Sequence, residues 1–131
     1  MTKSEWLDLT VLERKKYNLL SEVMDVSQQM GEALDRGDDV SVRMLVAMRQ
    51  EPILRLQEVR QAETARLESL APEDRERAKA LREGAGPQGG EEESFCTQAG
   101  NARRLLERVL ELDQRLNRRL AGDSSFYAQK K

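Results

Sequence analysis

The amino-acid sequence predicts an all-α protein, an elongated antiparallel bundle of three long helices with a short helix between the second and the third. The composition favours this fold class, because aromatic residues make up only 4% of the 131 residues and charged residues make up 35%. Leu, Val, Ala and Met must then supply most of the apolar side chains, as in amphipathic helices. Apolar residues also recur at spacings of three and four, the helical period. The length suits a single domain, which we place at residues 1–122.

The first helix is predicted over about residues 4–36. Gly37 suits the left-handed position that ends a helix, and Asp38 or Asp39 can cap the next one. We therefore expect a tight antiparallel hairpin. The apolar side chains that share one face of the first helix are Leu19, Val23, Val26, Met30 and Ala33.

The second helix is predicted over about residues 40–70. Pro52 falls inside it, and a proline in a helix interior removes a backbone donor and clashes with the preceding turn, at a cost of about 3 kcal/mol. We therefore expect this middle helix to be kinked or broken at Pro52. The apolar rhythm resumes directly after the proline, which favours a kink or a second helix start over a loop.

A short helix is predicted after Pro72, because proline suits the first helical position and acidic residues follow it. Residues 84–93 are rich in Gly and Glu and are expected to form a flexible connector. The last helix is predicted over about residues 92–120. Gly122 is expected to end it, which leaves residues 123–131 as a flexible C-terminal tail.

The composition argues against an enzyme. The chain has no histidine, the usual proton carrier and metal ligand near neutral pH, so its one cysteine, Cys96, lacks a histidine base. We therefore expect no cofactor and no metal site. The 22 basic and 24 acidic residues are interspersed and give a net charge of -2, which argues against nucleic acid as a partner.

The sequence contains no recognisable signal peptide and no apolar segment of the length that spans a membrane. Stable membrane insertion is therefore not expected. A single cysteine cannot form an internal disulfide, which fits a reducing compartment. We predict a cytoplasmic protein.

The last helix has the widest apolar face in the chain. This face exceeds the narrow stripe that helix packing needs, so part of it is expected to remain for a partner. Its members are Leu105, Leu106, Val109, Leu112, Leu116 and Leu120.

Two further groups of apolar residues are candidates for partner contacts. Phe126 and Tyr127 in the predicted tail suit either a docking peptide or folding back onto the bundle, and both interpretations remain open. Four methionines surround the first hairpin, where packing between the two helices is favoured over a partner surface. They are Met24, Met30, Met44 and Met48.

Four features together point to one family of proteins. They are the first helix with Leu19 and Leu20, the segment GDDVSVRMLVAMRQEPILRLQEV, a charged midsection, and the final NARRLLERVLELDQRLNRRL followed by SSFY. In these features, which span nearly all of the chain, the protein resembles flagellar export chaperones of the FlgN type.

The resemblance implies a cytoplasmic chaperone that binds amphipathic segments of hook-associated (hook-filament) junction proteins and delivers them to the type III export apparatus. It places the client-binding groove on the last helix, at the six-residue apolar face named above. It also implies that an export-gate component binds a tyrosine beyond the main helices, and Tyr127, beside Phe126, is the matching position. The alternative is a structural or regulatory helical bundle that forms a homo-oligomer through coiled-coil self-association.

Overall fold

The computed structural model describes the backbone of residues 1–129 and the side chains of residues 1–122. This part of the chain is helical and contains no strand. The predicted all-α fold class, with three long helices and one short one, is confirmed. In chain order the elements are α1 (Lys3–Asp35), α2 (Asp39–Glu68), α3 (Pro72–Arg82) and α4 (Gly90–Gln129).

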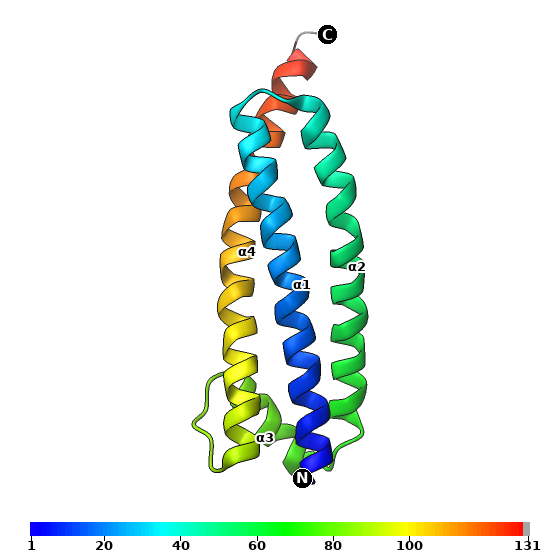
Figure 1. Cartoon of the computed structure of the whole chain (residues 1–131), viewed down its shortest axis with the longest axis vertical. Helices are drawn as coiled ribbons and strands as arrows, with labels where there is room; N and C mark the ends of the chain where they lie inside the picture. Colours follow the sequence, from blue (N-terminus) through cyan, green and yellow to red (C-terminus); the bar gives the residue numbers. More distant parts are fainter. Residues whose placement is uncertain (130–131) are drawn as a thin grey trace.

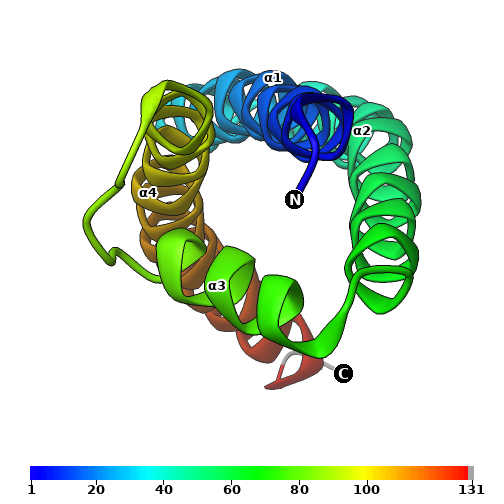
Figure 2. The same cartoon turned by 90° about the horizontal axis from the view of Figure 1, so that it is seen from below.

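The long helices run alternately up and down along the long axis of the molecule (Figure 1). Seen along that axis, α1 lies between α2 and α4, and α3 lies on the side opposite α1 (Figure 2). α1 packs against both long neighbours, whereas no Cα atom of α2 comes within 8 Å of a Cα atom of α4 in the described chain. α3 contacts both α2 and α4, at the end of the bundle where the N-terminus lies.

Local sequence signals set both ends of α1. The Thr2 hydroxyl accepts a hydrogen bond from the Glu5 N–H (3.1 Å), and the Thr2 N–H donates to the Glu5 carboxylate (2.8 Å), which makes a capping box. At the other end Gly37 has a φ of 68°, and the Asp38 carboxylate accepts from the Ser41 N–H to cap α2. The predicted tight hairpin is confirmed.

α2 passes through Pro52 as one helix, so of the predicted kink or break at this residue the break is wrong (Figure 1). Apolar side chains on both sides of the proline are packed in the core, Leu45 before it and Ile53 after it. This burial offsets the cost of about 3 kcal/mol that the missing backbone donor imposes.

α4 is longer than predicted at both ends. It begins at Gly90, so residues 90–93 of the expected connector belong to the helix, and its first turn carries Glu91, Glu92 and Glu93, where the helix dipole favours negative charge. It continues beyond Gly122 to Gln129, so the predicted helix end is wrong. Gly122 does not have a positive φ, and a glycine inside a helix costs only about 1 kcal/mol relative to alanine.

The core is divided into three apolar clusters along the bundle. In the first cluster, at the α3 end, the rings of Trp6 and Phe95 lie 5.6 Å apart between their centroids. This cluster contains Trp6, Leu9, Leu67, Leu70, Ala78, Leu81, Phe95 and Ala99. The second cluster contains Leu20, Val23, Ala102, Leu105 and Val109. The third, at the hairpin end, contains Met30, Ala33, Val42, Leu45 and Leu116.

Two polar layers separate these clusters. The buried carboxylates of Glu13 and Glu63 lie between the first and the second cluster. Between the second and the third, Arg49 donates a hydrogen bond to Ser27 Oγ (3.1 Å) and forms a salt bridge with Asp113 (2.6 Å). Arg49 thereby joins α2 to α4, whose backbones do not meet. Because buried charged groups need specific partners, these layers favour one register of the three helices.

Replacing Leu116 by alanine should lower the free energy of unfolding by about 2–5 kcal/mol, because this side chain is only 2% exposed and its loss leaves a cavity in the third cluster. Leu110→Ala is the matched control on the same helix. Leu110 is 51% exposed, so a loss of less than about 1 kcal/mol is expected. Urea denaturation followed by circular dichroism measures both, and equal losses would contradict the placement of Leu116 in the core.

Candidate functional site

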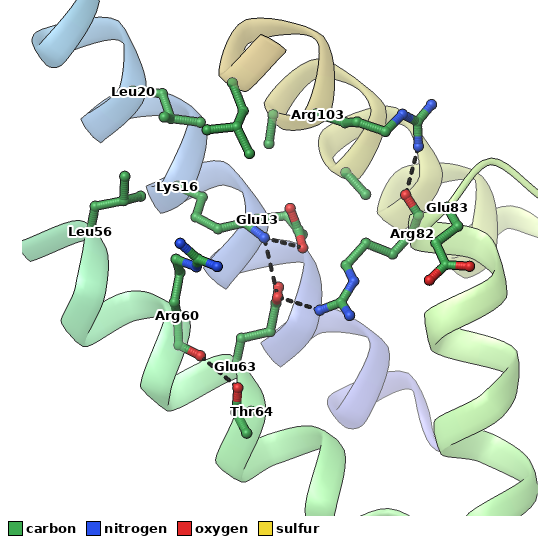
Figure 3. A pocket seen from close by; sticks show the side chains of 13 residues that line it. Glu13, Lys16, Leu20, Leu56, Arg60, Glu63, Thr64, Arg82, Glu83 and Arg103 are labelled. Carbon is green, nitrogen blue, oxygen red and sulfur yellow. Dashed lines mark hydrogen bonds and ion pairs between the residues drawn. The ribbon is translucent and has the colours of Figure 1, made fainter. Parts of the chain in front are cut away.

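A cavity of about 390 Å³ lies between α2 and α4, just beyond the C-terminal end of α3, and is partly open to solvent (Figure 3). All four helices, with Glu83 after α3, contribute to its wall. Its apolar lining consists of Leu20, Leu56, Ala99, Ala102 and Leu106. Its charged lining consists of Glu13, Lys16, Arg60, Glu63, Arg82, Glu83 and Arg103.

A network of charged side chains at the cavity floor joins all four helices. Glu63 Oε1 accepts hydrogen bonds from Lys16 Nζ (3.1 Å) and from Arg82 Nη1 (2.8 Å) (Figure 3). Lys16 Nζ also lies 3.0 Å from Glu13 Oε1. Arg103 completes the network from α4, because its Nη1 donates to the carbonyl oxygen of Arg82 (2.6 Å).

The two floor carboxyls are almost fully buried, Glu13 at 1% and Glu63 at 3% exposure. Loss of solvation, together with the neighbouring Glu63, raises the pKa of Glu13 to about 8. Burial alone would also raise the pKa of Glu63, but the hydrogen bond from Glu13 and the charges of Lys16 and Arg82 outweigh it and lower this pKa. At neutral pH the pair therefore carries one negative charge, on Glu63.

These buried carboxyls have few hydrogen-bond partners. Within the described chain, Glu13 and Glu63 share a hydrogen bond and Lys16 Nζ lies 3.0 Å from Glu13 Oε1, but no further donor reaches the carboxyl of Glu13 or Oε2 of Glu63. Buried polar atoms are usually satisfied by protein or by water.

Two arginines bind α3 to the neighbouring helices. They thereby fix the part of the cavity wall that α3 contributes. Arg75 donates to three carbonyl oxygens at the C-terminal end of α2 (3.1–3.4 Å). Arg77 makes two hydrogen bonds to the carboxylate of Glu92 in α4, at 2.7 and 3.4 Å. α3 is thereby tied to both long helices, and its last residue, Arg82, reaches Glu63.

The structure places most of the predicted client-binding face inside the bundle. Leu105 and Val109 belong to the second core cluster and Leu116 to the third, and Leu112 and Leu120 pack partly buried against the third. Leu106 is 37% exposed and lines the cavity. Because α1 and α2 already cover most of this face, the accessible part of the predicted groove is reduced to Leu106 and to the partly exposed Leu112 and Leu120.

Other expected features fall outside the cavity. The side chains of Phe126 and Tyr127 lie outside the described residues. Of the four methionines, Met30 is buried between the helices as expected, whereas Met44 and Met48 are exposed.

The sequence analysis did not single out the floor residues Glu13, Lys16 and Glu63. A signal for them does exist in the sequence. In α1 the buried positions Trp6, Leu9 and Leu20 define a helical period, and Glu13 and Lys16 fall on the same period. A charged residue on an apolar face indicates a buried polar site, because such residues are rarely buried without partners.

The other candidate chemistry has little support. Burial, together with the nearby Glu92, raises the pKa of the Cys96 thiol, which reduces the reactive thiolate. Among the residues that the structure describes, no group of three or more acidic or thiol side chains could hold a metal ion. None of the described helices is long and apolar enough to cross a membrane.

The comparisons with known proteins give no family for this chain. No family model, no curated protein and no solved structure matches it.

Glu13→Gln should flatten the dependence of stability on pH. Because the folded chain keeps a proton on Glu13 that the unfolded chain loses above about pH 4.5, the free energy of unfolding of the wild type should fall as pH rises from about 4.5 to about 8. The change should be on the order of 5 kcal/mol, and glutamine, which keeps the neutral shape, should remove most of it.

Urea midpoints at about pH 5.5 and about pH 9 measure this difference. Glu63 affects stability in the opposite direction and at lower pH. Because its pKa is lowered in the folded chain, its contribution to the free energy of unfolding is lost only as pH falls below about 4.5. Glu58→Gln, an exposed site on α2, is the control. A wild-type stability that stays constant or rises over this range would contradict the raised pKa of Glu13.

Proposed function

We propose that the protein is a chaperone that holds an amphipathic helix of a partner protein in the cavity between α2 and α4. The observation that carries this proposal is the uncovered side of the bundle. α3 covers the side opposite α1 at one end, and directly beyond it the wall combines Leu20, Leu56 and Leu106 with the ion pair of Lys16 and Glu63. A helix lying there would contact α1, α2 and α4 together.

The physical gain would come from two sources. Helices pack with their axes about 8–10 Å apart, so a partner helix between α2 and α4 would bury the exposed part of Leu106 and its own apolar stripe. A polar side chain of the partner could also pair with the exposed Arg60 on the α2 wall. The free amphipathic segment of a client would otherwise self-associate. Binding in the cavity would prevent this by covering its apolar face.

The resemblance to flagellar export chaperones of the FlgN type names the clients to test. They are the C-terminal segments of hook-filament junction proteins, which the chaperone would hold in the cytoplasm before the type III export apparatus receives them. In this proposal the client site is the cavity, and Leu106 is the member of the predicted α4 groove that lines it. The proposed function requires no catalytic step.

Self-association is the second candidate. The α4 face that the sequence assigned to a coiled coil is mostly inside the bundle. However, α2 carries a row of exposed apolar side chains at intervals of four residues, Val40, Met44 and Met48. A homo-oligomer would therefore form through α2.

Leu106→Gln should weaken client binding about tenfold, or about 1.4 kcal/mol, because it replaces an apolar wall of the cavity with a polar one. Leu110→Gln is the matched control, since Leu110 lies one turn further along α4 and does not line the cavity. Calorimetric titration with C-terminal peptides of junction proteins measures both variants.

Sedimentation velocity on the same samples reports whether the chain is a monomer before the peptide is added. Equal affinities of the two variants would contradict binding in the cavity. A stable dimer that does not respond to any client peptide would favour self-association instead.

Tyr127→Ala should leave client binding unchanged but lower client secretion about tenfold, because the export gate is proposed to bind this tyrosine as an anchor residue. Tyr17→Ala is the control, a tyrosine that is partly exposed on α1. The client secreted by flagellated cells that carry each variant as the only copy is measured by immunoblotting. Normal secretion by the Tyr127→Ala cells would contradict the docking role.

A further inference from the structure

We propose that the helix held in the cavity is acidic, with Asp or Glu residues on both sides of its apolar stripe, and that these residues pair with Arg60 of α2 and Arg103 of α4. This inference rests on the proposed function and adds the chemistry of the partner. It is carried by the two arginines at the cavity walls and by the charge of the lining.

Arg60 stands on the α2 wall of the cavity (Figure 3). Its side chain is exposed, and its guanidinium makes no hydrogen bond and no salt bridge with the described part of the chain. The stem of such an arginine can lie along the apolar wall while its charged head stays free for a partner.

Arg103 stands on the α4 wall, across the cavity from Arg60 (Figure 3). One of its N–H groups donates to the carbonyl oxygen of Arg82 at 2.6 Å, which fixes the direction of the side chain. No carboxylate of residues 1–122 forms a salt bridge with it. Its remaining donors are therefore open to an acidic partner.

Other arginines between the helices do have carboxylate partners. Arg49 pairs with Asp113 at 2.6 Å, Arg77 with Glu92 at 2.7 Å, and Arg82 with Glu63 at 2.8 Å. The contrast indicates that the charges of Arg60 and Arg103 are not matched by a carboxylate within the described chain. Guanidinium groups suit bidentate pairing with carboxylates, so acidic residues are the natural complement.

The charge of the whole lining favours the same kind of partner. Four basic and three acidic side chains surround the cavity, the acids being Glu13, Glu63 and Glu83. Lys16 and Arg82 compensate the floor carboxylates directly. Since Glu13 is largely neutral at neutral pH, the lining has an excess of positive charge that an acidic helix would meet.

The length of the site limits the size of the contact. The α4 residues that line the cavity run from Ala99 to Leu106, which is roughly 10 Å or two helical turns. A partner segment therefore needs one apolar stripe over two turns and at least one acidic residue on each side of it.

The test uses three helical peptides of about 18 residues with the same leucine stripe. They differ only in the residues beside the stripe, which are Glu, Gln or Lys. The full chain should bind the Glu peptide about tenfold more tightly than the Lys peptide, with the Gln peptide between them, and this preference should shrink as salt is raised.

Charge reversal at one wall provides the second measurement. Arg60→Glu should weaken binding of the Glu peptide about five- to tenfold and strengthen binding of the Lys peptide. Arg55→Glu is the control, because Arg55 is also exposed on α2 but lies roughly 140° around the helix from Arg60 and does not line the cavity. Circular dichroism confirms that both variants are folded.

The outcomes separate this inference from the proposed function. Equal binding of the three peptides, or an equal effect of the two charge reversals, would overturn the acidic partner while leaving helix binding intact. Preference for the Lys peptide by the wild type would also overturn it. Binding of none of the three peptides would overturn both.

Discussion

The arrangement of this protein depends on α1, the one long helix that packs against both of the others. Because the backbones of α2 and α4 do not meet in the described chain, they are held together by α1 on one side and by α3 at one end. Arg49, with its salt bridge to Asp113, spans the gap further along. The cavity lies between these two bridges, so it is a consequence of the topology and of the short length of α3.

The charged residues at the cavity floor contribute to the fold and also line the proposed partner site. Burial of Glu13 and Glu63 costs solvation, which is offset in part by the hydrogen bonds that Glu63 accepts from Lys16, Arg82 and Glu13. A protein that needed only stability would do as well with apolar residues at these positions. Together with Arg103, which donates a hydrogen bond to the backbone of α3, Glu13 and Glu63 connect all four helices at the cavity where a partner would bind.

Much of the fold followed from local patterns. Gly37 and Asp38 predicted the hairpin, and Pro72 predicted the short helix, because caps and first-turn prolines act within a few residues. Gly122 does not end α4, and Pro52 does not break α2, one of its two predicted effects, since packing on both sides of Pro52 and the small cost of one helical glycine outweigh their local tendency to end a helix. The cavity could not be predicted, because its walls come from residues far apart in the chain, and the apolar pattern of α4 does not separate core leucines from Leu106.

The central claim is that a partner helix occupies the cavity between α2 and α4. Methyl NMR of the full chain, titrated with an acidic amphipathic peptide, tests it most directly. The account predicts that the largest shifts occur at the methyl groups of Leu20, Leu56 and Leu106, which line the cavity. Shifts confined to Val40, Met44 and Met48 on the exposed face of α2, or no shifts at all, would contradict it.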